Sequence, residues 1–298
     1  MRLDVVPLNL DFDIAQSQAM SDDGNWVVYA SLATSPPRAG FRRSRAGVVE
    51  AFPRDTGRSF PRLFSPSADG SSVLTSDGVL KIAPGQSAAE AVFNEEPQIP
   101  GVFPSLRHLT SDGRLALLAL EQDGPSLGAI WNTETSETDR FLPPRGFEWA
   151  GGSFLSDSGE LAVGTAAVRQ PLIDRPFVRR KGEQARELRV VLDRFGDTSS
   201  NYYVIERVGG MSRDGKTILV FYSSPWYGDG AAIVTLPDWE PCPADINFDG
   251  VVDDGDFVLF VDAYLRLTTT DGDLTLDRMT DNADFVIFAT AYNEFLCP

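Results

Sequence analysis

Histidine and cysteine are scarce in this chain of 298 residues, which contains one histidine, His108, and two cysteines, Cys242 and Cys297. Protein zinc sites draw most of their ligands from these two residue types, so the sequence offers no histidine cluster for zinc. It also contains neither a G-x-S-x-G nucleophile elbow nor a P-loop. Because no cysteine or serine motif accompanies His108, we interpret it as a hydrogen-bonded or exposed residue at a strand end, with a catalytic role as the alternative.

Positive charge is also in short supply. The chain has 26 basic and 43 acidic residues, which gives a formal net charge of −17. Such a surface argues against binding to nucleic acids or to anionic membranes. No apolar run approaches the roughly 20 residues that a membrane-spanning helix needs, so we expect no membrane span. The first residues, from Met1 to Asp4, lack the features of a signal peptide.

The acidic residues concentrate near the carboxyl end. From residue 243 onward the chain carries twelve acids and two arginines, a net charge of −10. Within this stretch a 12-residue loop places side-chain oxygens at positions 1, 3, 5, 9 and 12 and a glycine at position 6. Calcium takes about six to eight oxygen ligands, and the glycine permits a turn that lets the carbonyl of residue 7 face the ion. We therefore predict a calcium site with the ligands Asp245, Asn247, Asp249, Val251 (through its carbonyl), Asp253 and Asp256.

The same pattern recurs 28 residues later, and an apolar run follows each loop. The run from Phe285 to Tyr292 repeats much of the run from Phe257 to Tyr264. This duplication predicts two loop–helix units, with a pair of solvated Asp-rich turns as the alternative. Arg278 replaces the glycine of the second loop, and a left-handed backbone there costs about 1 kcal/mol, so we expect the second calcium site to be weaker. Its predicted ligands are Asp273, Thr275, Asp277, Met279 (through its carbonyl), Asp281 and Asp284.

The two cysteines bracket this duplicated unit. A disulfide between Cys242 and Cys297 would tie its ends together and would stabilise it by about 4 kcal/mol on the chain-entropy estimate. A module of fewer than about 60 residues has a small core, so both a metal and a disulfide would help it fold. Two free buried thiols are the alternative. A disulfide implies an oxidising compartment, so we expect a secreted or cell-surface protein whose signal peptide is not present in this chain.

Residues 242–298 resemble type I dockerin modules, and most of all the dockerin-like modules of secreted bacterial proteins that carry Cys-Pro at each end. The resemblance implies that each loop binds calcium and that the paired helices present a face to a cohesin partner. Positions 10 and 11 of the two loops are Asp254-Gly255 and Asn282-Ala283. These differ from the hydroxyl pairs of cellulosomal dockerins, so the expected partner is a cohesin-like or other cell-surface protein.

A second repeat organises residues 1–240. The pattern Ser/Thr-x-Asp-Gly, with Ser in place of Asp once, precedes an apolar run five times, with glycines at 24, 70, 113, 159 and 215. An Asp-Gly pair between apolar runs indicates a hairpin, and repeats of about 45 residues with several short strands are typical of propeller blades. We predict a mainly β fold: a five-bladed β-propeller over residues 1–240, closed by Leu3–Leu10 pairing onto the last blade, with six or seven blades as the alternative. A small all-α calcium-binding module follows over residues 241–298.

The turns are similar to the Ser-Pro-Asp-Gly repeats of Tol-system periplasmic propellers, a resemblance that supports the fold and not a function. Four groups of residues in the propeller region remain as candidates for function. Three aromatic residues could hold a sugar ring or a peptide, or could pack on an edge strand. A short basic segment could meet an acidic ligand or the tail, or be a solvated loop, and residues 169–189 are interpreted as a basic loop insertion. Four acids are interpreted as solvated loop carboxylates. The three aromatic residues are Tyr222, Trp226 and Tyr227, and the short basic segment is Arg38–Arg45. The loop insertion, residues 169–189, is richest in basic residues around Arg179-Arg180-Lys181. The four acids are Glu95, Glu96, Asp174 and Glu183.

These features predict a secreted, non-catalytic attachment protein. The propeller is expected to bind a carbohydrate, peptide or protein, and the tail to act as a calcium-dependent protein-interaction module. The alternative is a propeller-type polysaccharide hydrolase or lyase anchored by the tail, which would require two converging carboxylates. A purely structural surface protein is a third interpretation.

Overall fold

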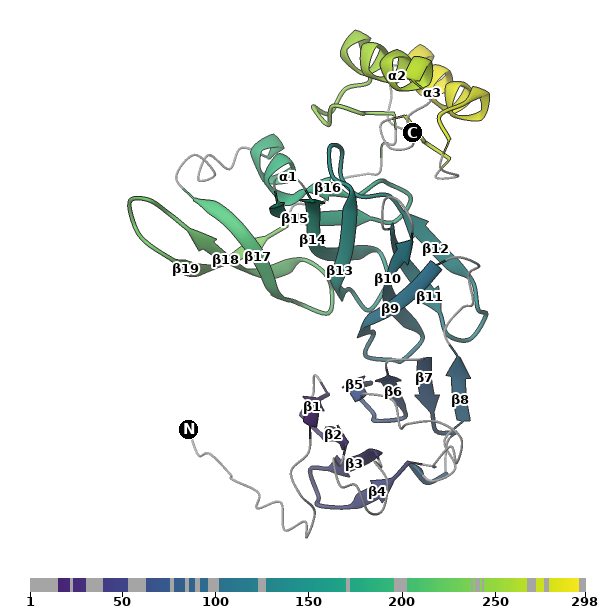
Figure 1. Ribbon diagram of the computed structural model, residues 1–298, viewed down its shortest axis with the longest axis vertical. Helices are drawn as coiled ribbons and strands as arrows, with labels where there is room; N and C mark the ends of the chain where they lie inside the picture. The colour runs from purple at the N-terminus through teal and green to yellow at the C-terminus, as the bar shows by residue number, and fades with distance from the viewer. Residues whose placement is uncertain are drawn as a thin grey trace. The chain divides into compact units, whose positions relative to one another are not determined.

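A computed structural model of the protein (Figure 1) shows a mainly β fold, with five antiparallel sheets and three helices in the part of the chain that it describes. The chain divides into two compact units. The first unit comprises Met1–Glu96 with Ser111–Gly113, and the second comprises Pro97–Thr110 with Arg114–Pro298. The described residues are 16–21, 24–30, 40–52, 63–75, 78–83, 86–88, 92–95, 102–122, 127–169, 172–195, 203–236, 238, 242, 244–266, 272–275 and 279–294.

The sheets are consecutive meanders in which each strand pairs with the next one along the chain. The first unit contains the sheet β1 (Gln16–Met20), β2 (Trp26–Ala30), β3 (Gly40–Ser44), β4 (Val49–Ala51) and the sheet β5 (Leu63–Pro66), β6 (Ser72–Thr75), β7 (Gly78–Lys81), β8 (Val92–Glu95). The second unit contains the sheet β9 (Val102–Leu109), β10 (Leu115–Gln122), β11 (Leu127–Asn132), β12 (Thr138–Phe141), the sheet β13 (Trp149–Leu155), β14 (Leu161–Arg169), β15 (Leu172–Arg180), β16 (Arg186–Glu187), and the three-stranded sheet β17 (Val204–Met211), β18 (Thr217–Ser223), β19 (Gly230–Thr235).

Each of the five described sheets has the predicted turn between its first two strands, with the pattern Ser/Thr-x-Asp-Gly in four of them and Ser158 in place of Asp in the fourth sheet. The five turn glycines have φ between 69° and 76°, a left-handed conformation that glycine adopts without steric cost. In each turn the residue five positions after the Ser or Thr donates its backbone N–H to that hydroxyl, at 2.9–3.0 Å. The predicted hairpins are therefore confirmed. The donor and acceptor pairs are Trp26–Ser21, Ser72–Ser67, Leu115–Thr110, Leu161–Ser156 and Thr217–Ser212.

A repeated contact stacks each turn on its neighbour. A Cβ added to Gly70 would lie 2.5 Å from the ring of Trp26, and one added to Gly159 would lie 2.6 Å from Leu115. In both cases the partner stands two positions after the preceding turn glycine. The same relation joins Gly113 to Ser72 and Gly215 to Leu161. Within each unit, successive sheets thus stack in the manner of propeller blades.

The last sheet differs from the others in what covers its face. The residue four positions after each turn glycine is fully buried in the first four sheets, and Val163, for example, packs against Val208 and Val220 of the next sheet. The equivalent residue of the last sheet, Leu219, is 37% exposed, and its cross-strand neighbour Ile233 is 75% exposed. The three other buried equivalents are Val28, Leu74 and Leu117.

The interpretation of residues 169–189 as a loop insertion is wrong. Most of this stretch forms β15, a turn and β16, and β15 pairs with β14 along its whole length. Arg179 is fully buried, donates to both carboxylate oxygens of Asp139 at 3.0 and 2.8 Å, and lies over the Phe141 ring. Arginine is normally a surface residue, so the pattern of apolar residues in the sequence could not indicate that Arg179 is buried and pairs with an acid of another sheet.

The interpretation of Arg38–Arg45 as a basic loop is also wrong for residues 40–44, which form β3. Arg42 is buried, donates to Glu50 at 2.6 Å and to the carbonyl of Gly70 at 2.6 Å, and stacks on Trp26. Arg38 and the proposed closing strand, Leu3–Leu10, lie outside the described residues.

Three helices complete the second unit: α1 (Leu188–Arg194), α2 (Asp254–Arg266) and α3 (Asn282–Glu294). The helix α1 follows β16 directly and packs on β15 and β16. Of the helices that the structure describes, none is both long enough and apolar enough to cross a membrane.

Candidate metal centre

The two carboxyl-terminal helices begin in the same way. Asp253 accepts a hydrogen bond from the N–H of Gly255 at 2.7 Å, and Asp281 accepts one from the N–H of Ala283 at 2.7 Å. A carboxylate at this place satisfies an N–H that has no partner within the helix and lies at the positive end of the helix dipole. Position 9 of each loop therefore also serves as the N-cap of the helix that follows.

Position 12 closes each loop through a second repeated pair of bonds. The carboxylate of Asp256 accepts the N–H of Asn247 at 2.9 Å and the N–H of Asp253 at 3.1 Å. In the second loop Asp284 accepts the N–H of Thr275 at 2.7 Å and the N–H of Asp281 at 2.8 Å. The sequence duplication is thus also a duplication of hydrogen bonds.

Three carboxylates converge in the first loop. Each of Asp245, Asp249 and Asp256 offers an oxygen that lies within 4.8 Å of the others. Asp245 and Asp256 are fully buried, and burial raises the pKa of both above its ordinary value of 3.8. The N–H groups of Asp249 and Gly250 donate to the two oxygens of Asp245, each at 3.0 Å, and so fix its orientation. Oxygen ligands of this kind suit calcium, a hard cation.

Two further predicted ligands, Asn247 and Val251, bond to Asp249 of this cluster, whereas the carboxylate of Asp253 is not among the three that converge. The side-chain oxygen of Asn247 accepts the N–H of Asp249 at 2.8 Å. Val251 donates its N–H to Asp249 at 2.9 Å, and its side chain is exposed. Gly250 has φ of 100°, as the turn at position 6 requires.

The second loop is described in part. Asp273 and Asp284 are fully buried, as are their counterparts in the first loop. Thr275 donates its hydroxyl to Asp273 at 3.4 Å, and the side chain of Met279 is exposed. Asp277 and Arg278 lie outside the described residues, so the expected weakness of this site stays a prediction.

The helices pack through aromatic rings that hold the two loops together. Phe260 of α2 and Phe288 of α3 are almost fully buried and stack with ring centroids 4.8 Å apart and planes inclined by 17°. They belong to a small core that also contains Cys242, Ala244 and Val252. Cys297 lies outside the described residues.

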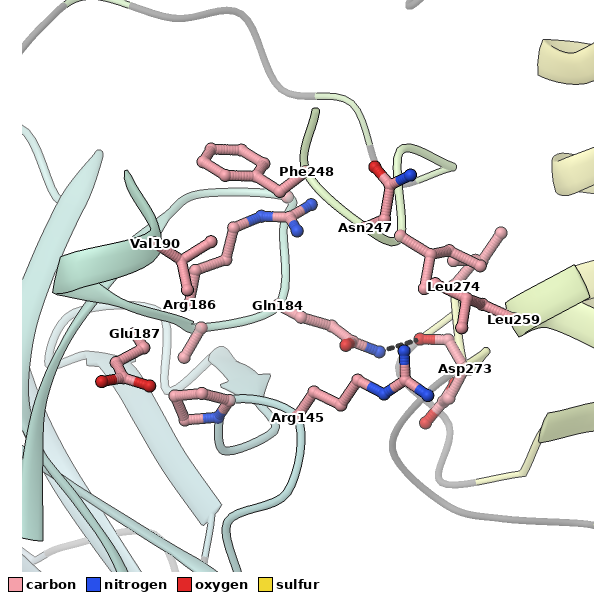
Figure 2. Close-up of a pocket in the computed structure, with 14 residues that line it drawn as sticks. Arg145, Gln184, Arg186, Glu187, Val190, Asn247, Phe248, Leu259, Asp273 and Leu274 are labelled. Carbon is pink, nitrogen blue, oxygen red and sulfur yellow. Dashed lines mark hydrogen bonds between the residues drawn. The ribbon is translucent and has the colours of Figure 1, made fainter. Parts of the chain in front are cut away.

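The first loop docks on the β16–α1 surface of the same unit. Phe248, at loop position 4, is buried in the apolar cluster that contains Leu188 and Val191 of α1. Arg186 and Arg194 lie over its ring at 3.9 and 4.3 Å from the centroid. Figure 2 shows Arg186 beside this ring. Stacking of a guanidinium on an aromatic face is favourable and strengthens as water is excluded.

Polar bonds also join the module to this surface. Two fall on Asp245: Arg186 donates to its carbonyl at 2.9 Å, and Arg194 donates to its carboxylate at 3.3 Å. Glu183 accepts the N–H of Cys242 at 2.7 Å, and Gln184 donates to the carbonyl of Asp273 at 3.0 Å (Figure 2).

A cavity of about 360 Å³ lies at this junction, lined from both sides. Sequence reasoning missed these docking residues, and it assigned Glu183 wrongly as a solvated carboxylate, although the side chain is buried. The available signal was a basic stretch in a chain whose tail is strongly acidic.

The other candidate residues do not form a catalytic set in the part of the chain that the structure describes. His108 lies on β9 and packs edge-on against Phe154, 5.9 Å between centroids. Asp174 is exposed on β15, while the side chains of Glu95 and Glu96 lie outside the described residues.

Two of the aromatic candidates are exposed: Trp226 by 77% and Tyr227 by 71%. Tyr222 is half-buried on β18, and its ring lies against Gly230 of the edge strand β19. Tyr203 contacts both Tyr222 and Tyr227, with ring centroids 4.8 and 5.8 Å apart.

No protein-family model and no curated protein matches the sequence. Solved structures match in fold alone. Prolyl oligopeptidase B from Galerina marginata has a TM-score of 0.51 at 11% identity over 76% of this chain and 32% of its own. Oligogalacturonate lyase in complex with manganese has a TM-score of 0.50 at 14% identity over 75% of this chain and 66% of its own. TolB from Acinetobacter baumannii has a TM-score of 0.45 at 14% identity, and the match covers 76% of this chain but only 55% of TolB.

Proposed function

We propose that residues 241–298 form a dockerin-like module that binds two calcium ions. One observation carries this proposal: two loops 28 residues apart bury an aspartate at positions 1 and 12 and close with the same carboxylate-to-backbone bonds. Buried carboxylates that lie close together repel one another unless a cation neutralises them. A bound calcium ion would supply that neutralisation, and the chain's own residues would hold it through the ligands predicted from the sequence.

The donor set of the first loop fits calcium better than a transition metal. Its convergent groups are carboxylates, and the part of the loop that the structure describes offers no imidazole or thiolate ligand. We expect the second ion to bind more weakly, because Arg278 occupies the turn position that Gly250 fills in the first loop.

Native mass spectrometry of the full chain tests this proposal. Protein exchanged into dilute calcium should carry up to two calcium ions, and protein treated with chelator should carry none. A mass that does not change with calcium would contradict the proposal.

We propose further that the helix pair is a protein-interaction surface. The same positions are exposed on both helices: Phe257 and Val258 on α2, and Phe285 and Val286 on α3. Apolar side chains repeated on one module suit a protein partner, such as a cohesin-like or cell-surface protein. In a pull-down with the full chain as bait and calcium present, loss of the captured partner protein in Val258→Asp and Val286→Asp would support this role. Unchanged capture of that protein by both variants would contradict it.

The sheets are proposed to be the five blades of one propeller. The exposed face around Leu219 supports this, because the equivalent positions in the other four sheets are fully buried by a neighbour. In a closed ring the first sheet, β1–β4, would cover that face. The propeller would then act as a non-catalytic binding surface, and the exposed Trp226 and Tyr227 would hold a carbohydrate or peptide. Ligand binding that survives Trp226→Ala and Tyr227→Ala would contradict this assignment.

A disulfide between Cys242 and Cys297 is proposed to close the module. Cys242 is buried, and the described part of the chain contains no free cysteine. Such a bond places the protein in an oxidising compartment, so we propose that it is secreted or displayed at the cell surface. Two alkylatable thiols in protein secreted from its native host would contradict both statements.

A further inference from the structure

Arg194 covers the amino-terminal half of the first loop. Its guanidinium donates to the buried carboxylate of Asp245 at 3.3 Å and lies over the ring of Phe248. A Cβ added to Gly250 would lie 3.0 Å from the same guanidinium. One cation at the end of α1 therefore meets loop positions 1, 4 and 6.

We propose that Arg194 is a tethered counter-ion of the first loop, which holds the loop closed without metal and opposes the entry of calcium. The inference rests on the proposed calcium site and concerns how that site is regulated. It predicts that docking of the module on α1 and loading of the first loop are coupled, so that a change in one shifts the equilibrium of the other.

The charges of the loop give the physical reason. Asp245, Asp249 and Asp256 crowd their oxygens within 4.8 Å, and without a cation their mutual repulsion would open the loop. Arg194 brings one positive charge to this cluster, which offsets part of the repulsion. Calcium brings two, so it binds more strongly, but it must share Asp245 with a guanidinium of the same sign or displace it.

The docking contacts keep Arg194 in place. Arg186 lies on the Phe248 ring as well and donates to the carbonyl of Asp245 at 2.9 Å. Phe248 itself is buried among residues of α1. The backbone of the loop is thus anchored next to the guanidinium, which raises the local concentration of the competing charge.

Hydrogen–deuterium exchange of the full chain at graded free calcium tests the proposal and resolves the two loops separately. The variant Arg194→Gln removes the charge. The matched control is Arg189→Gln, since Arg189 lies on the same helix and forms an exposed ion pair with Asp193 at 3.4 Å. Arg194→Lys is a second variant, because it keeps the charge but loses the planar fork.

Without calcium, Arg194→Gln should lose protection in residues 245–256, and Arg189→Gln should keep it. The calcium midpoint of this loop should fall about fivefold or more in Arg194→Gln, by less in Arg194→Lys, and should not move for residues 272–284. An unchanged or raised midpoint in Arg194→Gln, with both loops still protected by calcium, would overturn the counter-ion role alone. If calcium protects neither loop of the unmodified chain, the proposed calcium function fails instead.

Discussion

Tyr292 of α3 donates its phenolic hydrogen to Asp254 at the start of α2. The duplicated partner of this bond runs the other way: Tyr264 of α2 donates to Asn282 at the start of α3 at 2.6 Å. Each helix thus binds position 10 of the opposite loop, and the module is tied by two reciprocal bonds related by the 28-residue repeat.

The bond to Asp254 makes a prediction about pH. It is the main cause that raises the pKa of Tyr292 above its ordinary value of 10.0. Since the folded state holds the phenolic proton more tightly, the bond contributes stability below pH 10 and loses it as the pH rises through the raised pKa. A titration of ¹³C-labelled tyrosine followed by NMR should show a raised pKa for Tyr292, and Asp254→Asn should return this pKa toward the ordinary value. A normal Tyr292 titration in the unmodified chain would contradict the bond.

Calcium affinity should fall early on acidification. Burial raises the pKa of Asp245 and Asp256, and a carboxylate must be ionised to bind the metal. As the pH falls toward these raised values, protons compete with calcium before an exposed aspartate would be protonated. The stability of the metal-free module should show the opposite trend, because protonation relieves the cost of two buried charges and so stabilises the fold.

Calorimetric titrations at a series of pH values from neutrality down to the ordinary pKa of aspartate measure this directly. We expect the calcium affinity to fall steadily as the pH is lowered, after the measured heats are corrected for buffer ionisation. A constant affinity down to the ordinary pKa of aspartate would mean that the buried carboxylates are not the ligands.

The exposed face of the last sheet predicts the outcome of one substitution. If a further sheet covers Leu219 in a closed ring, Leu219→Lys should reduce the free energy of unfolding by about 2–3 kcal/mol. The control Val48→Lys, at a 57% exposed turn residue, should change it by less than about 0.5 kcal/mol. Urea unfolding of both variants separates the cases, and equal small effects would argue against ring closure.

The pair formed by Arg179 and Asp139 should respond unequally to the loss of either partner. The Arg179 side chain is 0% exposed and that of Asp139 is 39% exposed. Asp139→Asn leaves a buried guanidinium without its counter-charge, which should cost about 3 kcal/mol. Arg179→Met leaves only a partly solvated carboxylate and should cost less. A larger loss of stability in Arg179→Met than in Asp139→Asn would contradict this explanation.

The hairpin turns and the hydrogen-bonded carboxylates at the starts of α2 and α3 were predictable because local rules determine them. Glycine at 24, 70, 113, 159 and 215 can adopt the left-handed turn, and an aspartate at a helix start accepts an N–H wherever the helix packs. The docking of Phe248 between Arg186 and Arg194 was not predictable in this way. It joins segments about 50–60 residues apart, and a lone aromatic residue in a polar loop carries no periodicity that reveals its partner.

Buried arginines explain the two wrong interpretations of basic segments. Arg42 and Arg179 lie on strands and pair with acids on other strands, Glu50 and Asp139. Sequence patterns treat arginine as a marker of exposed loops, whereas a bidentate partner and an aromatic face can accommodate it inside a sheet. Only the fold brings those partners together.

The most direct test of the account is a calorimetric titration of chelator-dialysed full chain with calcium, alongside the variants Asp256→Asn and Asp284→Asn. We predict that the unmodified chain binds two calcium ions, that each variant loses one, and that Asp256→Asn loses the tighter site. Absence of heat up to about millimolar calcium, the weak end of the range for such loops, would contradict it.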